Sequence, residues 1–546
     1  MSFPPRHFAP PAALALGLCL ALTGCGGRSP IDEATEAGIL IRGNAAEPKG
    51  LDPHLVSGVL EDNIIRALFE GLCTEDPEKD GVPLPGVAER WEANEDFTEW
   101  VFHLRPDAVW SDGEPLTTDD FLFSYERILT PALGAEYAAM LHYIAGAQDF
   151  NEGKTNVFST VGVTADDAHT LRIRLRGSIP FLPELTKHYT WYPVPKHTVL
   201  ANGPMADPFS TWTKPGKLVS NGPFILKSWR LNDHIEVEKN PRYWDADTVS
   251  LNGVRFLPVV NSYTESRMFF NRQMHLTYAL PPELIGYSKE RLPGEVRQEL
   301  YLGTLFMRCN TKREGLKDDR VRRALSLALD RKSLIDNVVQ GGQEPARGIV
   351  PPFGNYQSPD LIHFDATEAK RLLAEAGYPD GQGFPDLKFL ITDRDTAKRL
   401  GEAIQGMWRD TLGIRVRIEQ MEWGSYLQSQ FEMTYDIVLG GWIGDYLDPT
   451  TFLDMWVTNN GNNNTGWSNR DYEALLTEGE HTADPTERLK VLQRAETILL
   501  NDRPVIPIYW YTTNYLIHSS VKNWNPMLLS HQPYKFIRLE SGVGNQ

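Results

Sequence analysis

The order of helical and strand patterns between residues 366 and 443 constrains the fold more than any other feature of this sequence. Each pattern is short, and the two types alternate. The segments are, in order, a helix over 366–377 that Gly377 closes, a strand over 387–391, a helix over 396–413, a strand over 414–419, a further helix, and an apolar strand that begins at 437. Such alternation is typical of an α/β unit with a partly parallel sheet.

The remaining sequence contains strand and helix patterns as well, so the fold class that we predict is α/β with mixed sheets. Residues 98–105 and 170–176 alternate apolar and polar residues, as half-buried strands do. Residues 119–129 place apolar side chains on one helical face behind Asp119, which we expect to cap that helix. Residues 318–339 predict a longer helix. We find no internal repeat and no long linker, and therefore expect domains that are interleaved rather than strung out.

The N-terminus has the order of features that is typical of a secreted bacterial lipoprotein. A basic residue precedes an apolar stretch over 12–22, which is far shorter than the roughly 20 residues that span a bilayer. The following LTGC, at 22–25, resembles the bacterial lipobox, and this implies cleavage before Cys25 and lipidation of that residue. We therefore predict a signal peptide over 1–24, a linker over 25–37, and an extracytoplasmic protein that a lipid anchor holds at a membrane.

Composition and motif spacing argue against several classes of function. A chain with a formal net charge of −18 would be repelled by phosphate backbones, so nucleic acid is a poor partner. No Cys or His cluster has metal-ligand spacing, and we predict neither a metal nor a cofactor. Val109 stands where a hydrolase nucleophile elbow around Ser111 would need glycine. Cys73 and Cys309 could form one disulfide in an oxidising compartment, although their spacing does not show whether they meet.

Two acids follow a strand-like apolar run in YDIVLGGWIGDYLDPTTFLDMW, residues 435–456. Asp448 has a structural explanation, as the N-cap of a helix whose first residue is Pro449. Asp445 stands among apolar neighbours with no basic residue close by in the sequence, and a carboxylate there is costly unless it meets a cation or several donors. A partner from elsewhere in the fold stays open. Nearby glycines let another backbone approach closely, so the stretch suits a ligand with an ammonium group and peptide bonds.

Part of this stretch, GWIGDYLDPTTFL at 441–453, resembles the signature of the oligopeptide-binding proteins, the solute receptors of ATP-driven peptide importers. Further segments match in the same order: LDPH (51–54), LFEGL (68–72), PGVAERWE (85–92), VFHLRPDAVWSDGEPLTTDDF (101–121), SNGPFILKSW (220–229), EKNPRYWD (238–245), VRRALSLALDR (321–331) and IPIYWY (506–511). The resemblance therefore spans nearly the whole chain after the N-terminal segment.

The resemblance implies a three-domain, periplasmic-binding-protein-like clamshell, type II-like with an extra inserted domain. The implied ranges are 38–70, 197–302 and 512–546 for domain I, 71–196 for domain II, and 303–511 for domain III. Two connecting segments, near 301–308 and 506–511, would let domain III close over the ligand. The ligand's backbone would pair like an added strand, which gives affinity without regard to side chains.

The same resemblance implies roles for individual residues. Asp445 would pair with the α-ammonium group of a peptide. Trp442, with the backbone of Gly441 and Ile443, would form the strand that pairs with the ligand. Gly58 and Val59 would form a facing strand from domain I, and Tyr137 would close over the ligand's N-terminal end. Both aromatic residues could instead be core side chains.

The sequence departs from the family pattern at the other end of the predicted cleft. The positions whose basic side chains hold a peptide carboxy-terminus in some members are Ala397, Gln430 and Leu439 here. A disulfide that some members have beside the pocket would need cysteines at Gly303 and Ile443. We predict that the amine anchor is kept and that ligand length is not fixed by the same contacts. Arg394 or Lys398 could substitute, although a solvated loop and helix start explain them as well.

These observations favour a lipid-anchored receptor that binds oligopeptides, delivers them to an ABC permease in the membrane, works as a monomer and performs no chemistry. Two alternatives remain. The same fold could bind a modified or cell-wall peptide or another amine-bearing solute, as the missing carboxylate anchors suggest. A secreted hydrolase is the third interpretation, and the absence of a nucleophile motif argues against it.

Overall fold

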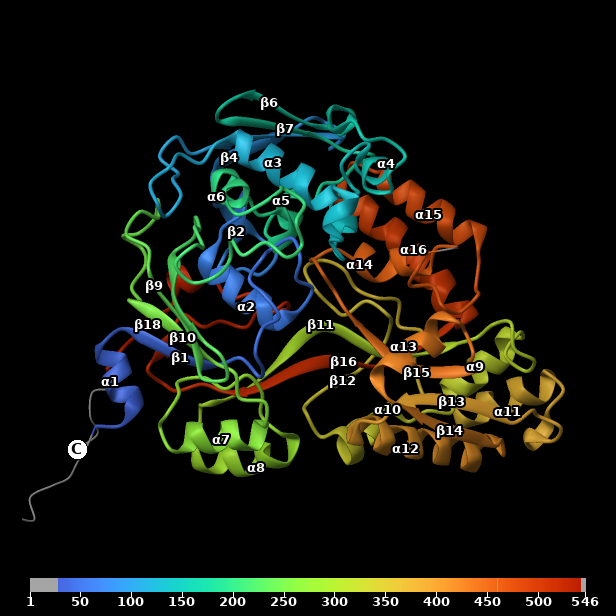
Figure 1. Cartoon of the computed structure of the whole chain (residues 1–546). Coiled ribbons are helices and arrows are strands. Elements are labelled where there is room, and N and C mark those ends of the chain that lie inside the picture. Colours follow the sequence, from blue (N-terminus) through green and yellow to red (C-terminus); the bar gives the residue numbers. More distant parts are fainter. Residues whose placement is uncertain (1–27, 459, 542–546) are drawn as a thin grey trace, which may run out of the picture.

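The computed structural model describes residues 28–458 and 460–541, which fold into two lobes joined by a long pair of strands (Figure 1). Both mixed and antiparallel sheets are present, with helices packed on their faces. The predicted α/β class with mixed sheets is therefore confirmed. The predicted signal peptide and Cys25 lie outside the described residues. Among the described residues, no helix is both long and apolar enough to cross a membrane.

The first lobe contains two four-stranded sheets. One has the order β1 (Ile39–Gly43), β10 (Gly253–Leu257), β9 (His234–Lys239) and β8 (Phe224–Arg230), with β1 parallel to β10 and the other pairs antiparallel. The other is antiparallel, in the order β4 (Ala88–Ala93), β5 (Glu99–Leu104), β7 (Thr170–Arg174) and β6 (Val163–Asp167). The strands predicted over 98–105 and 170–176 are thus neighbours. Two-stranded ladders add β2 (Cys73–Glu75) with β3 (Pro83–Pro85), and β17 (Val521–Lys522) with β18 (Arg538–Leu539).

The second lobe is built on a six-stranded sheet that contains the alternating region. The order is β12 (Glu344–Pro345), β16 (Val505–Leu516), β11 (Val296–Cys309), β15 (Ile437–Ile443), β13 (Leu387–Thr392) and β14 (Val416–Met421). β13 runs parallel to both β14 and β15. The connecting helices are α11 (Ala366–Glu375), α12 (Asp395–Leu412) and α13 (Trp423–Phe431), so the predicted helix–strand alternation is correct. Gly377, at φ +99°, follows α11 as expected.

β11 and β16 connect the lobes (Figure 1). They pair antiparallel from Val296 opposite Leu516 to Arg308 opposite Val505, and the register shifts between Leu300 and Thr304. An irregularity of this kind bends a strand pair locally. Both segments that we expected to connect the domains, near 301–308 and 506–511, lie in this ribbon.

The structure corrects two predictions about helices. Thr117, not Asp119, caps α3 (Thr118–Leu129), because its hydroxyl accepts the Asp119 N–H while Asp120 accepts the Thr117 N–H in return. The single helix expected over 318–339 is interrupted. It forms α9 (Asp319–Leu327), α10 (Arg331–Leu334) and a π-helical turn over Ile335–Val339, since Asp330 caps a new helix through the Ser333 N–H.

Part of the predicted linker over 25–37 is also structured. Residues Pro30–Glu36 form helix α1, which Ser29 caps in a reciprocal box with Asp32. Ile31 and Ala34 are buried, so the segment packs on the first lobe instead of hanging free. The two cysteines that could have formed a disulfide, Cys73 and Cys309, are free thiols buried in different hydrophobic clusters.

The remaining helices cover the two lobes. In the first lobe they are α2 (Val59–Leu68), α4 (Ala147–Asn151), α5 (Leu182–Leu185), α6 (Lys196–Ala201), α7 (Ser262–Phe270) and α8 (Pro282–Arg291). In the second lobe they are α14 (Thr450–Leu453), α15 (Arg470–Glu480) and α16 (Pro485–Asp502). Single-turn helices lie between these elements.

Candidate ligand-binding cleft

One edge of β15 is open over most of its length. On one side β15 pairs with β11 along its whole run, from Ile437 opposite Cys309 to Ile443 opposite Gly303. On the other side only Ile437 and Val438 pair with β13. Residues 439–443 therefore have no strand partner on that side within the described chain. An extended peptide can add to such an edge through main-chain hydrogen bonds.

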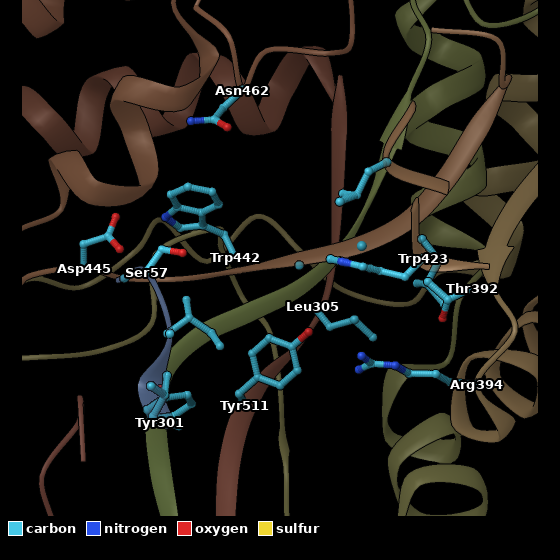
Figure 2. Close-up of a pocket in the computed structure, with 18 of the residues that line it drawn as sticks. Ser57, Tyr301, Leu305, Thr392, Arg394, Trp423, Trp442, Asp445, Asn462 and Tyr511 are labelled. Atoms are coloured by element: carbon cyan, nitrogen blue, oxygen red, sulfur yellow. The ribbon is translucent and has the colours of Figure 1, made fainter. Parts of the chain in front are cut away.

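A cavity of about 820 Å³ lies beside this edge, between the lobes (Figure 2). Its size falls in the range of roughly 300–1,000 Å³ that ligand pockets occupy. All residues to which the resemblance assigned a binding role line it: Gly58, Val59, Tyr137, Gly441, Trp442, Ile443 and Asp445. These residues come from both lobes, so the fold brings together segments that are far apart in the sequence.

Gly58 and Val59 reach the cavity in a different conformation from the one we expected. The predicted facing strand is absent from this described segment. Gly58 is extended (φ −110°, ψ 149°) and is the N-cap of α2, whose first residue is Val59. A Cβ at position 58 would lie 2.1 Å from a carboxylate oxygen of Glu61, so glycine leaves room for this side chain in its present position. The helix start thus replaces the strand at this wall.

Asp445 contributes a carboxylate that the described residues leave without a cation. Its N–H donates to the Thr451 hydroxyl at 3.0 Å, while no salt bridge and no hydrogen bond to the carboxylate oxygens forms in this part of the chain. The side chain is only partly exposed at the cavity wall. Desolvation by the surrounding apolar groups raises the pKa of Asp445 to about 7.

Asp448 has a structural partner, which corrects and extends the helix-cap prediction. The helix α14 begins at Thr450, one residue later than expected, and the Asp448 carboxylate accepts the Thr450 N–H at 3.0 Å. The same carboxylate accepts two hydrogen bonds from the buried Arg488 guanidinium, at 2.6 and 3.0 Å. Arg488 lies on α16, 40 positions away, so the local sequence gave no sign of this ion pair.

Aromatic side chains line the cavity between its two ends. Tyr137 stacks on His188 with ring centroids 6.1 Å apart, and Trp442 also packs against the core of the second lobe. A Cβ at Gly441 would lie 2.3 Å from the Tyr511 hydroxyl, so glycine allows this phenol to approach the strand. The residue-level reasoning missed several of these aromatic groups: Tyr189, Tyr301, Trp423, Tyr426, Tyr509 and Tyr511. The IPIYWY segment held the only sequence signal for the last two.

Comparison with known proteins gives the family. The model of the bacterial extracellular solute-binding proteins, family 5, matches residues 82–464, which is more than half of the chain. This protein belongs to that family. The clamshell fold that the resemblance implied is therefore confirmed.

Named relatives of this family-5 protein are peptide-binding proteins. It is 35% identical to the periplasmic oligopeptide-binding protein OppA of Salmonella typhimurium over 92% of this chain and 94% of that protein. It is 32% identical to the periplasmic murein peptide-binding protein MppA of Escherichia coli, over 89% and 90%.

Solved structures agree with these relatives. The unliganded open form of the murein tripeptide-binding protein MppA superposes with a TM-score of 0.79 at 31% identity, covering 92% of this chain and 98% of that one. Haemophilus influenzae OppA in complex with the peptide RPPGFSPFR superposes with a TM-score of 0.76 at 32% identity, covering 92% and 99%.

The far end of the cleft in this family-5 protein has the uncharged residues that the sequence indicated. Ala397, Gln430 and Leu439 all line the cavity. Arg394 lines it too, and its guanidinium lies 5.8 Å from the centre of the Trp423 ring, whereas Lys398 is not among the lining residues. Figure 2 shows Asp445 and Arg394 at opposite ends of the cavity.

Two further observations complete the site. Gly303 and Ile443, the positions at which some family members carry a disulfide, are direct partners across the β11–β15 ladder. Cysteines at these two positions would therefore face each other across the ladder. Sequence reasoning missed Arg308, a buried residue of β11 that lines the same cavity. Within 28–458 and 460–541, no cluster of three or more His, Cys, Asp or Glu residues could hold a metal ion.

Proposed function

We propose that this protein is an extracytoplasmic receptor that binds oligopeptides in the cleft and delivers them to an ABC-type importer. The observation that carries the proposal is Asp445, a desolvated carboxylate to which the described residues offer no cation, at one end of a cavity that runs along an open strand edge. A peptide supplies both missing partners, because its α-ammonium group pairs with the acid and its backbone pairs with the strand.

The geometry of the edge supports binding of varied sequences. Main-chain hydrogen bonds to residues 439–443 would hold any extended peptide, and alternate side chains would point into spaces on either side. A second cavity, of about 490 Å³, shares Tyr137, Trp442 and Asp445 with the first and offers space for a side chain near the ligand's N-terminus. The lining residues of both cavities come from the two lobes, so ligand binding would favour the closed arrangement.

The proposal includes the cellular setting and the domain division. A lipid on Cys25 would hold the receptor at the membrane, as a monomer, beside the permease that accepts its peptide. The segments 38–70, 197–302 and 512–546 would form domain I and move together with domain II, the inserted 71–196. Domain III, 303–511, would close by bending of the β11–β16 ribbon, where the register shift between Leu300 and Thr304 lies.

The test is the Asp445→Asn variant, measured by calorimetry with matched peptides that carry a free or an acetylated N-terminus. A charge-assisted hydrogen bond contributes about 1.5–3 kcal/mol, so the variant should weaken free-amine peptides by about 10- to 100-fold and leave acetylated peptides unchanged. The control is Asp395→Asn, an exposed acid that lines the same cavity. Equal losses for both peptides would refute the ammonium role.

A cell-wall peptide is the alternative ligand class. It is supported by the similarity to the murein tripeptide-binding protein and by the uncharged Ala397, Gln430 and Leu439. Native mass spectrometry of the purified receptor distinguishes the two classes by the mass of the co-purified ligand. Ordinary peptides of mixed sequence support the main proposal, and one defined mass that contains non-protein amino acids supports the alternative.

A further inference from the structure

Arg308 is a buried cation without a carboxylate partner in the described parts of the chain. Its side chain is 3% exposed, yet it lines the cavity. One hydrogen bond, at 3.5 Å, joins its Nη1 to the Gln430 side-chain oxygen, and its Nε has no partner among the described residues. Burial lowers the pKa of Arg308 below its ordinary value. Burial of a guanidinium with so few hydrogen bonds costs free energy, and a partner that binds in the cavity would offset this cost.

Two other buried arginines of the same lobe have a partner within the fold for every guanidinium nitrogen, whereas a third, Arg503, keeps two nitrogens without a partner among the described residues but does not line the cavity. Arg322 donates to the main-chain oxygens of Asp502, Leu316 and Lys317. Arg331 donates to three main-chain oxygens and to the Ser326 hydroxyl. Both side chains serve packing, since backbone carbonyl groups surround them. Arg308 differs from both, because its guanidinium makes a single long hydrogen bond and lines the cavity.

Gly440 gives the guanidinium access to the open edge of β15. A Cβ at position 440 would lie 3.2 Å from Arg308 Nη1 and 2.8 Å from the Tyr426 hydroxyl. The Tyr426 hydroxyl in turn donates to the Leu439 carbonyl at 2.7 Å. On its other side Arg308 packs over the Phe306 ring, 4.8 Å from its centroid. The charged group is thus held in one place beside Gly440 and Gln430.

We propose that Arg308 binds a carboxylate of the ligand, in the first place the peptide's C-terminus, at the end of the cleft opposite Asp445. This inference rests on the proposed function, since it requires a peptide along β15. A carboxylate that accepts two hydrogen bonds from the guanidinium would satisfy its free donors and neutralise its charge. It would also replace, from a neighbouring strand, the basic groups that are absent at Ala397, Gln430 and Leu439.

The separation of the two charges predicts a ligand length. Gly440, which marks the guanidinium, and Asp445 are five positions apart. At a rise of about 3.3 Å per residue this spacing is at most about 16 Å, because Gly444 and Asp445 lie beyond the end of β15, and it accommodates an extended peptide of up to roughly four to five residues. Such a peptide is a zwitterion whose two ends match the acid and the base. Shorter peptides would reach only one of them.

The experiment measures the affinity of the full-length receptor and its Arg308→Met variant for tetra- and pentapeptides with a free or an amidated C-terminus. Methionine keeps the apolar stem and removes the charge. We expect the variant to weaken free-carboxylate peptides by about 10- to 100-fold and to bind amidated peptides as the unaltered receptor does. Arg394→Met removes the other arginine that lines the cavity and tests the competing assignment. A selective loss of free-carboxylate peptides in Arg394→Met, with none in Arg308→Met, would assign the carboxylate to Arg394 and overturn the proposal.

A third peptide, with an amidated C-terminus and a glutamate in its last position, identifies the source of the carboxylate. If Arg308→Met weakens this peptide as well, an acidic side chain also serves as the partner. If it weakens only free C-termini, the terminal carboxylate is the partner. Unaltered affinity for every peptide, or equal losses for amidated neutral and free peptides, would overturn the proposal.

The outcome is separable from that of the proposed function. If Asp445→Asn weakens the binding of free-amine peptides and Arg308→Met changes no affinity, the proposed receptor function stands and only the role of Arg308 is rejected. Thermal unfolding of the unliganded variant checks its fold. Removal of an unpaired buried charge should leave the melting temperature equal or higher, and the amidated peptides provide a second check, because they should bind normally.

Discussion

Asp445 and Asp448 are the same residue type on one loop, three positions apart, and the fold treats them differently. Asp448 is buried against Arg488, which donates two hydrogen bonds to it. Asp445 has no such cation within the described residues, and its pKa is raised to about 7. Between them, Tyr446 bonds to Tyr143 of the other lobe. A carboxylate with an internal partner holds the lobe together, and one without is available to a ligand.

The largest expected effects come from replacing each acid by asparagine, with opposite signs for stability. Asp448→Asn leaves the buried Arg488 charge without its partner, and breaking such a pair costs about 3–5 kcal/mol. Asp445→Asn removes a carboxylate whose pKa is raised from 3.8 to about 7 on folding. The cost of its charge appears as the pH rises above 3.8 and is complete above pH 7, so this variant should be more stable than the parent at pH 8.

Thermal and urea unfolding of the two unliganded variants at pH 8 and pH 4 checks this contrast. The gain from Asp445→Asn should be largest at pH 8 and nearly absent at pH 4, where the parent carboxyl is protonated. The loss from Asp448→Asn should persist at pH 8. If both variants are destabilised equally at pH 8, the distinction between a structural and a ligand-binding acid is wrong.

The second expected effect is a loss of peptide affinity in acid. Ionised Asp445 strengthens binding by about 10- to 100-fold, so affinity should fall about 5- to 25-fold between pH 7 and pH 5 if the pKa of the free receptor's acid is about 7. Histidines at the cavity do not contribute in this range, because burial lowers the pKa of His188 to about 3 and that of His531 well below its ordinary value. Above pH 7 affinity should rise by no more than about twofold before the ligand amine itself loses its proton.

Calorimetry across this pH range, in buffers of different ionisation enthalpy, should show that the receptor releases a proton on binding at pH 6. Asp445→Asn is the matched control and should show neither the proton release nor the steep dependence. A parent receptor with constant affinity from pH 5 to pH 7 would contradict a raised pKa at this acid.

Sequence patterns predicted the fold class and selected residues that line one end of the candidate cavity, for physical reasons. The helix and strand patterns of 366–443 are local, because the apolar spacing of each segment can be read without knowledge of the other segments. Asp445 was recognisable because an unexplained charge in an apolar stretch is itself a local signal. Gly441, Trp442 and Ile443 follow from the same segment. The ordered motifs of the family then placed Gly58 and Tyr137 at the cavity.

The other end of the site depends on contacts between distant segments, which no local pattern encodes. Arg308 looks in the sequence like one polar residue at the end of an apolar strand. Only the fold shows that Gly440 and Gln430 lie beside it and that no acidic side chain among the described residues pairs with it. The Asp448–Arg488 pair was missed for the same reason. The cap of α3 is an exception, because the capping box of Thr117 and Asp120 is a local pattern. We predicted Asp119 as the cap although this box was visible in the sequence.

The smallest expected effect concerns Tyr446, whose hydroxyl lies 2.6 Å from that of Tyr143 and whose ring stacks on Phe181 across the cleft. Tyr446→Phe keeps the stack and removes one hydrogen bond between the lobes, together with a 3.3 Å contact to the Thr450 hydroxyl within its own lobe. Because one such bond contributes about 0.5–1.5 kcal/mol, the closed arrangement should be disfavoured and peptide affinity should fall about 2- to 10-fold. Calorimetry with one free-amine peptide measures this loss.

Two variants sharpen that result. Tyr143→Phe should cost the same, and the double variant no more than either single one, since all three lack the same bond. Tyr472→Phe is the control within one lobe, because that hydroxyl donates to the Leu453 carbonyl at 2.6 Å. It should lower the melting temperature without changing affinity. Additive losses of affinity for Tyr446→Phe and Tyr143→Phe would mean that the two hydroxyls act separately. The loop that carries Tyr446 would then contact only its own lobe and the ligand in a way that affects binding.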